Sequence, residues 1–201
     1  TAMPLANCSL LDEATAAAEA ATMMYGLRSR DQQKKGTNVL FVDESIFPQN
    51  LAVIQTRVIP QGMKIQVGNY KELEFTPEIF ACIIQYPNAS GSVEDYREFV
   101  EKAHAANCKV AVDADILSLA LLLPPGEWGA DIVFGSTQRL GIPLFYGGPS
   151  AAYFATRDEY KRNMPGRIIG LSKDKYGKIC YRMALQLSLI HISEPTRHAQ
   201  I

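Results

Sequence analysis

The sequence predicts an α/β fold in which a mostly parallel β-sheet is flanked by helices. Three observations carry this prediction. Short, continuous apolar runs recur along the chain, as expected of strands that are buried on both faces. Helical segments alternate with these runs, and brief polar turns link the two. Hydrophobic residues make up 47% of the 201 residues and charged residues 20%, which is enough apolar material for one sizeable core.

The first predicted element is an alanine-rich helix over residues 9–30. Ser9 or Asp12 can cap its amino terminus, and Arg28 and Arg30 lie late, where they complement the helix dipole. The small alanine side chains would let this helix pack closely against a sheet.

Four apolar runs are predicted to form the parallel strands. A polar turn at residues 31–36 precedes the first of them. In chain order the runs cover residues 38–43, 82–87, 109–113 and 131–135. Further helices are predicted at residues 46–58 and 93–107, a short strand at 64–67, and an antiparallel strand at 151–155.

Polar residues lie at the carboxyl ends of several of these strands. Asp43 and Asp113 each end a strand, and the turn at residues 135–138 follows another. In open α/β sheets ligands bind beyond the carboxyl ends of the strands, so these residues are candidate ligand contacts. For each acid taken singly, the simpler alternative is a cap for a turn or for the following helix.

Composition argues against several classes of function. The 20 Lys and Arg residues balance the 21 Asp and Glu residues, whereas nucleic-acid binding needs clustered, uncompensated cations. No apolar run reaches the roughly 18 residues that span a bilayer. No signal peptide is recognisable, and we expect the chain to begin inside a longer gene product or after processing. The cysteines lie far apart with no nearby histidine, which predicts buried, reduced thiols rather than a zinc site. They are Cys8, Cys82, Cys108 and Cys180.

Three segments resemble one known family. They are LLDEATAAAEA at residues 10–20, VDADILSLALL at 112–122, and the long run at 129–170 that begins GADIVFGSTQRLGIPLFYGGP. These segments are similar to the P-protein of the glycine cleavage system, the decarboxylating glycine dehydrogenase. The resemblance implies a large domain of the aspartate-aminotransferase-like, fold type I, pyridoxal-phosphate-dependent fold, taken from the amino-terminal half of a two-half enzyme. We therefore predict one domain over residues 1–187, incomplete at both ends.

The resemblance also implies a function. The complete enzyme decarboxylates glycine with pyridoxal phosphate and transfers the aminomethyl group to the lipoyl arm of the H-protein. Implied partners are a carboxy-terminal catalytic half, or a separate catalytic subunit, and the lipoylated H-protein. Neither nucleic acid nor a membrane is expected. The implied location is the cytoplasm, or the mitochondrial matrix if the source is a eukaryote.

Three cofactor-binding features of the family can be compared with this chain. In the catalytic half a lysine before a glycine-rich turn binds the cofactor, but Gln138 stands at that position here. Arg139 cannot replace the lysine because its guanidinium group stays protonated. At the matching phosphate-binding turn, Asp12 and Glu13 would repel a phosphate dianion. Asp113 matches the carboxylate that pairs with the pyridine nitrogen, although a helix-capping role is the alternative.

The resemblance therefore implies a non-catalytic half that is inactive alone. We expect it to hold no catalytic residue, no metal and no cofactor, the pyridoxal phosphate being bound by the absent catalytic half. Two alternatives stay open. One is a separate scaffold or binding subunit of a two-chain glycine decarboxylase. The other is an independent pyridoxal-phosphate enzyme that uses another lysine, such as Lys109 or Lys173.

Other features have two interpretations each. The glycine-rich loop at residues 141–149 is either a ligand loop or a tight connection between strands. A basic loop faces either an anionic partner or solvent, and it contains Lys161, Arg162 and Arg167. His104 is expected to complement a helix dipole, and Trp128 to cover the sheet edge.

The resemblance breaks off near the end of the chain. Residues 188–201 look like translated adapter or vector DNA, so we predict a disordered, cloning-derived tail. Neither His191 nor His198 is therefore interpreted as a ligand.

Overall fold

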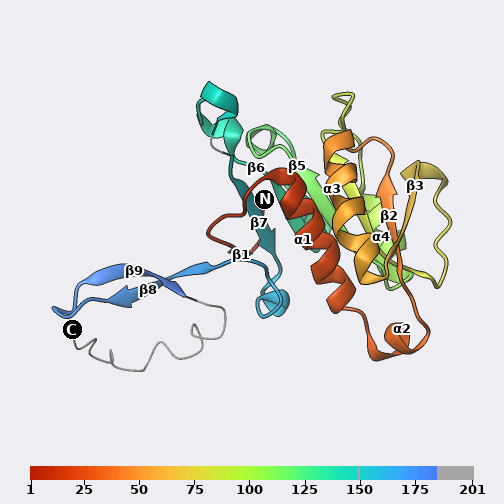
Figure 1. Ribbon diagram of the computed structural model, residues 1–201, viewed down its shortest axis with the longest axis horizontal. Helices are drawn as coiled ribbons and strands as arrows, with labels where there is room; N and C mark the ends of the chain where they lie inside the picture. Colours follow the sequence, from red (N-terminus) through yellow and green to blue (C-terminus); the bar gives the residue numbers. More distant parts are fainter. Residues whose placement is uncertain (149, 185–201) are drawn as a thin grey trace.

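A seven-stranded, mostly parallel sheet organises the fold (Figure 1). The structure, a computed structural model, describes residues 1–148 and 150–184. The strands are β1 (Leu5–Ala6), β2 (Val39–Asp43), β3 (Lys64–Gly68), β4 (Ile79–Tyr86), β5 (Lys109–Ala114), β6 (Ile132–Ser136) and β7 (Ala152–Thr156). Their order across the sheet is β1-β7-β6-β5-β4-β2-β3. Neighbours from β3 to β6 are parallel, whereas β7 is antiparallel to both β6 and β1. The predicted fold class and the antiparallel strand are thus confirmed.

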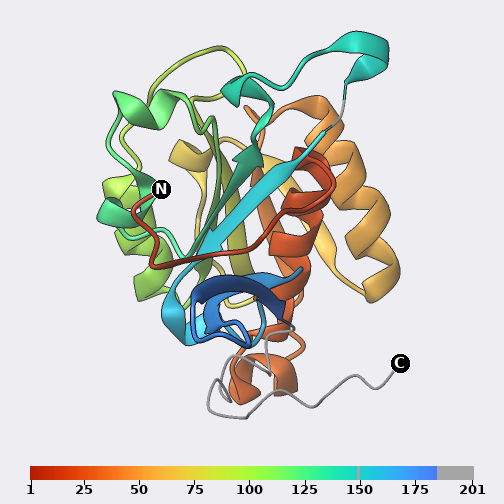
Figure 2. The same ribbon diagram turned by 90° about the vertical axis from the view of Figure 1, so that its left-hand side faces the viewer.

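Helices cover both faces of this sheet (Figure 2). They are α1 (Glu13–Gly26), α2 (Arg30–Lys34), α3 (Pro48–Val58) and α4 (Arg97–Ala105). The α1 and α3 helices pack with one set of strand side chains, and α4 packs with the other set. Alanines at positions 16, 17, 20 and 21 of α1 are fully buried, so the helix lies close to the sheet, as its composition predicts.

The amino-terminal helix is shorter than predicted. Its N-cap is Asp12, whose side chain accepts a hydrogen bond from the backbone N–H of Thr15 at 2.6 Å. The helix ends before Arg28, which instead donates its Nε to the Tyr25 carbonyl at 2.7 Å. The predicted turn at residues 31–36 was wrong for residues 31–34, which belong to α2, a helix that begins with a capping box.

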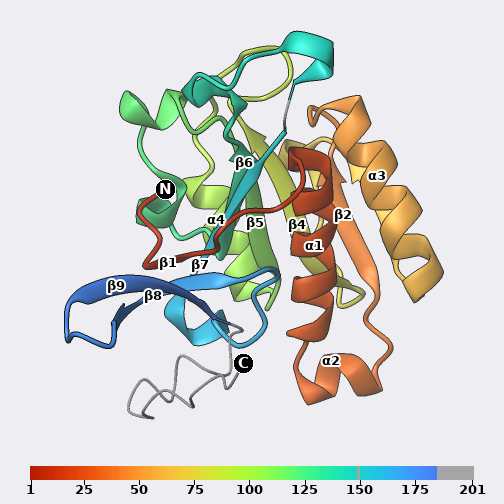
Figure 3. The same cartoon turned by 60° about the vertical axis from the view of Figure 1, so that its left-hand side comes forward.

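A two-stranded antiparallel ribbon follows the sheet and was not predicted. It consists of β8 (Ile168–Lys173) and β9 (Ile179–Ala184), and it extends away from the main sheet (Figure 3). Ile168 anchors the ribbon, because its side chain is buried in the core beside α1. The predicted tail at residues 188–201 lies outside the described residues.

The cysteines only partly follow expectation. Cys82 and Cys108 are buried, and burial raises the pKa of both thiols, that of Cys108 to about 11. Cys8 is exposed and Cys180 is half-buried, so the expectation of four buried thiols was wrong. Among residues 1–148 and 150–184, no helix is long and apolar enough to cross a membrane.

Candidate functional site

The carboxyl edge of the parallel strands is the first candidate site. Here β5 and β6 end, and the amino terminus of α1 lies at the same edge (Figure 3). The amino-terminal end of α3 also reaches this edge, since its Asn50 contacts Asp113 near the end of β5. The topology thus brings together the residues that sequence analysis selected from distant segments.

Asp113 is buried at this edge and is already occupied by protein groups. Asp113 is 1% exposed, and its Oδ2 accepts a hydrogen bond from Asn50 Nδ2 at 2.6 Å. Burial raises the pKa of Asp113 well above its usual range, and the neighbouring Glu13 carboxyl group raises it further. Both effects favour the neutral form of this carboxyl group, whereas a protonated pyridine nitrogen is stabilised by the charged form.

The amino terminus of α1 carries two acidic residues. Asp12 caps the helix through its side chain, and Glu13 lies next to Asp113. A phosphate dianion would need free backbone N–H groups at this point, and it would face two acidic residues. This turn is therefore a poor phosphate cradle, as its composition predicts.

Gln138 lies just beyond β6, in the first position of a short 3-10 helix. Its backbone N–H donates to Ser136 Oγ at 3.1 Å. A Cβ built on Gly148 would lie 3.3 Å from Gln138 Nε2, so the following loop packs against this amide. That loop connects the antiparallel neighbours β6 and β7.

Asp43, the other strand-ending acid, caps local structure. Its Oδ1 accepts hydrogen bonds from the backbone N–H and the hydroxyl of Ser45, and its Oδ2 accepts one from the Tyr70 backbone N–H at 3.0 Å. This is the simpler of the two interpretations that the sequence allows. Among the described residues, no three His, Cys, Asp or Glu side chains are grouped so that they could hold a metal ion.

These observations test whether the edge fits pyridoxal phosphate. Gln138 offers an amide where an amine is needed, the α1 terminus carries acids where a phosphate would bind, and Asp113 is bonded to Asn50. The donor set at this edge does not fit the cofactor.

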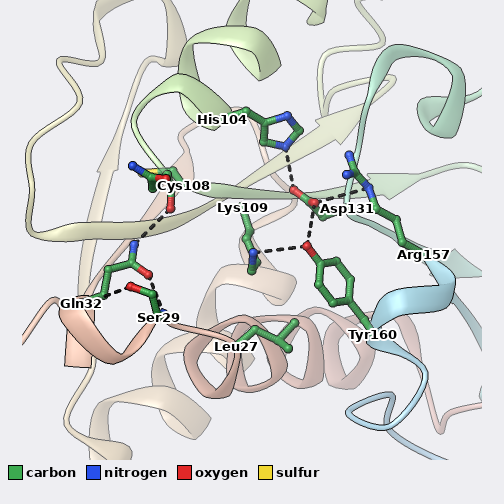
Figure 4. Close-up of a pocket in the computed structure, with 10 residues that line it drawn as sticks. Leu27, Ser29, Gln32, His104, Cys108, Lys109, Asp131, Arg157 and Tyr160 are labelled. Atoms are coloured by element: carbon green, nitrogen blue, oxygen red, sulfur yellow. Dashed lines mark hydrogen bonds and ion pairs between the residues drawn. The ribbon is translucent and has the colours of Figure 1, made fainter. Parts of the chain in front are cut away.

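A second cluster lies at the opposite edge, around the buried carboxylate of Asp131 (Figure 4). The Oδ2 atom of Asp131 accepts a hydrogen bond from the Val110 backbone N–H at 2.8 Å, and it also pairs with His104 Nε2 at 2.9 Å. Arg157 Nε lies 3.4 Å from its Oδ1. Burial alone would raise the pKa of Asp131, but the contacts with His104, Val110 and Arg157 outweigh it and lower the pKa.

Sequence analysis missed this cluster. His104 lies in the last turn of α4, as the helix-dipole interpretation expects, and its side chain also pairs with Asp131, 27 positions later in the chain. The cluster lines a cavity of about 330 Å³. Asp131 and Arg157 form hydrogen bonds and ion pairs with protein groups, so the cluster links the start of β6 to α4 and to the segment after β7.

The two alternative lysines do not lie at the carboxyl edge. Lys109 begins β5 at the opposite end, where its Nζ donates to the Tyr160 hydroxyl at 3.2 Å. Lys173 is exposed at the end of β8. Of the other residues considered, Lys161 pairs with Asp158 at 3.3 Å on the surface, and Trp128 packs edge-on against Tyr86.

Comparison with known proteins identifies relatives over nearly the whole chain. The family model described as "Glycine cleavage system P-protein" matches residues 1–198. The chain is 79% identical over 192 residues to "Glycine dehydrogenase (decarboxylating)" of Bacteroides fragilis, which is 96% of this chain and 20% of that relative. It thus spans about one fifth of the length of the curated relatives that it matches.

Solved structures agree with these relatives. The crystal structure of glycine decarboxylase (P-protein) of the glycine cleavage system, in inhibitor-bound form, superposes with a TM-score of 0.79 at 30% identity. This match covers 97% of the present chain and 46% of the solved chain. A methionine gamma lyase from Micromonospora echinospora, 17% identical, shares the fold with a TM-score of 0.61 over 78% of this chain and 40% of that chain.

Proposed function

Because the chain belongs to the glycine cleavage system P-protein family, we propose that it is the non-catalytic, scaffolding segment of a glycine decarboxylase. The complete enzyme decarboxylates glycine and transfers the aminomethyl group to the lipoyl arm of the H-protein. In this proposal the chain corresponds to residues of the amino-terminal half and binds no pyridoxal phosphate itself. The cofactor belongs to the catalytic half, which is its first partner, and the lipoylated H-protein is the second.

One observation carries this proposal above the others. In our interpretation Asp113 corresponds to the family carboxylate that faces the pyridine nitrogen. Here it accepts a hydrogen bond from Asn50, and its pKa is raised by burial. A site that stabilised a pyridinium would need this group ionised and available. Gln138 at the position of the cofactor lysine supports the same assignment, because an amide is not nucleophilic.

The edge instead performs a structural task. The hydrogen bond between Asn50 and Asp113 ties the start of α3 to the end of β5, and the Asp12 cap fixes the start of α1. The contact between Asn50 and Asp113 satisfies polar groups that burial would otherwise leave unpaired. The chain's own residues thus stabilise the segments that meet at the carboxyl edge.

Two points of the proposal concern the setting of the protein. We place it in the cytoplasm, since the 79% identical relative comes from a bacterium. A two-chain enzyme is the second candidate. The same stretch is one fifth of that relative but nearly half of the solved P-protein chain. The solved chain is therefore less than half as long as that relative, as a single subunit of a two-chain enzyme would be.

Reduction with borohydride in the presence of pyridoxal phosphate, followed by peptide mass analysis, tests the proposal. We expect scattered, substoichiometric labelling of exposed lysines. Stoichiometric labelling of one lysine, with Lys109 and Lys173 examined first, would establish the independent enzyme instead. Bovine serum albumin treated in parallel calibrates nonspecific labelling, and a Lys109→Arg variant identifies any signal from the cavity lysine.

A further inference from the structure

The β8–β9 ribbon has one apolar face that points into solvent. The register pairs Ile169 with Met183 and Leu171 with Tyr181, and successive side chains of a strand alternate between faces. These two pairs therefore lie on one face. The next pair toward the tip of the ribbon, Ser172–Cys180, lies on the other face. The exposed fractions are 60% for Leu171 and 80% for Tyr181.

Nothing else in the described part of the chain covers this face. The ribbon extends from the body of the molecule in both views (Figures 1 and 3). Its base is fixed, because the Cys8 backbone N–H donates to the Arg167 carbonyl at 2.6 Å and Ile168 is buried. A two-stranded ribbon is marginally stable in water when it packs on nothing. Its apolar face therefore needs a surface that the described residues do not provide.

The ribbon is also strongly basic. Residues 167–184 contain five cationic side chains and one acidic side chain, that of Asp174, and all six are exposed. None of the five has an ion-pair partner within residues 1–148 and 150–184. They are Arg167, Lys173, Lys175, Lys178 and Arg182. A surface that fits this ribbon would be an apolar strip bordered by carboxylates.

Four fifths of the length of the curated relatives lies outside this chain. We infer that the apolar face of the ribbon docks on that remaining part of the P-protein polypeptide, on an apolar strip with acidic borders. This inference rests on the proposed function and makes it specific, because it names the side chains through which the scaffold holds its partner. Leu171 and Tyr181 lie at the centre of the docking face.

Hydroxyl-radical labelling of Tyr181 tests the inference. The comparison uses the 201-residue chain and a full-length chimera, in which residues 1–184 replace the matching stretch of the Bacteroides fragilis relative. The chimera is first required to elute as that relative does. We expect Tyr181 to be labelled at least tenfold more slowly in the chimera than in the 201-residue chain.

Two substitutions at neighbouring positions provide the matched control. Leu171→Glu places a charge on the apolar face, and Ser172→Glu places the same charge on the opposite face. In the chimera, Leu171→Glu should restore fast labelling of Tyr181 and lower the Tm, whereas Ser172→Glu should change the labelling rate less than twofold. In the 201-residue chain neither variant should change the Tm, because both side chains lie outside the core.

Each other outcome overturns the inference. Equal labelling of Tyr181 in the two proteins would show that the face stays exposed in the full-length chain, while the proposed function would stand on its separate cofactor test. Slow labelling in the 201-residue chain would assign the face to a second copy if the chain sediments as a dimer. If that chain sediments as a monomer, slow labelling would assign the face to the chain's own residues.

Discussion

Asn50 and Asp113 are 63 positions apart in the sequence, yet the amide of Asn50 donates to the carboxyl group of Asp113 at 2.6 Å. Both residues are 1% exposed, so water cannot replace either partner. The contact joins the first turn of α3 to the carboxyl end of β5. The acid that family resemblance places against a cofactor is thus held by the protein's own amide.

Removing the amide should destabilise the fold. Asn50→Ala leaves the Asp113 carboxyl group buried with one partner fewer, which costs about 1–3 kcal/mol of unfolding free energy. Urea unfolding followed by circular dichroism at pH 7 measures the loss. Gln55→Ala, at an exposed position of the same helix, should stay within about 0.5 kcal/mol of wild type. Equal stability of the two variants would contradict the role assigned to Asn50.

The raised pKa of Asp113 predicts a pH dependence of stability. Between the unfolded pKa near 3.8 and the higher folded pKa, the folded state binds more protons than the unfolded state. The contribution of Asp113 is therefore fully present below about pH 3.8 and is lost as the pH rises through the folded pKa. Asp113→Asn removes this titration. The unfolding free energy of this variant should rise relative to that of wild type as the pH increases from 4 to 8. If urea unfolding shows the same difference in unfolding free energy at every pH in this range, the assignment is refuted.

Gly135 is expected to tolerate no side chain. A Cβ built there lies 2.2 Å from the Ala114 carbonyl oxygen and 3.0 Å from Cε1 of Tyr153. Gly135→Ala should therefore cost about 1–3 kcal/mol or more through overpacking between β5, β6 and β7. Gly26→Ala is the matched control, because a Cβ at Gly26 meets nothing within 4 Å. This second variant should be neutral or up to about 1 kcal/mol more stable, as thermal unfolding of both will measure.

The sequence predicted the sheet well because local patterns determine it. Continuous apolar runs such as the one at residues 38–43 have no alternative to burial on both faces. Helix ends were harder, since Ser9 and Asp12 are both good caps and their tertiary neighbours decide between them. Two signals were present and overlooked. Ser29 and Gln32 have capping-box spacing, and the alternation of apolar residues on either side of Asp174 is typical of a hairpin.

The site was predictable only in its residue types. Acids at strand ends pointed to the carboxyl edge, and Asp113 and Gln138 do lie there. No local pattern reveals that Asn50 would occupy Asp113, because that contact depends on how α3 packs across the sheet. The same limit applies to His104: its place in the last turn of α4 agrees with the prediction, but its partner Asp131 comes from a different strand connection.

Asp131 provides the last prediction, with a pH dependence opposite to that of Asp113. Its carboxylate, 3% exposed, binds His104, the Val110 N–H and Arg157. Because the two cations are 34% and 36% exposed, the main cost of removing the carboxylate is the buried Val110 N–H left without a partner, about 1–3 kcal/mol. Asp131→Ala should show this loss at pH 7 in urea unfolding. Glu159→Gln should lose at most about 0.5 kcal/mol, because Glu159 is exposed and lies 3.9 Å from the same arginine.

The lowered pKa of Asp131 sets the direction of the pH effect. Its stabilisation is present above the unfolded pKa near 3.8 and is lost as the pH falls through the lower folded pKa. The gap in unfolding free energy between wild type and Asp131→Ala should therefore narrow below about pH 4. The shift in favour of wild type relative to Asp113→Asn should instead occur as the pH falls from 8 to 4, and it should be complete below about pH 3.8. Parallel titrations of the three proteins compare the two carboxyl groups directly. A gap for Asp131→Ala that widens with acid would mean that Asp131 is neutral in the folded protein and that its contacts are not ion pairs.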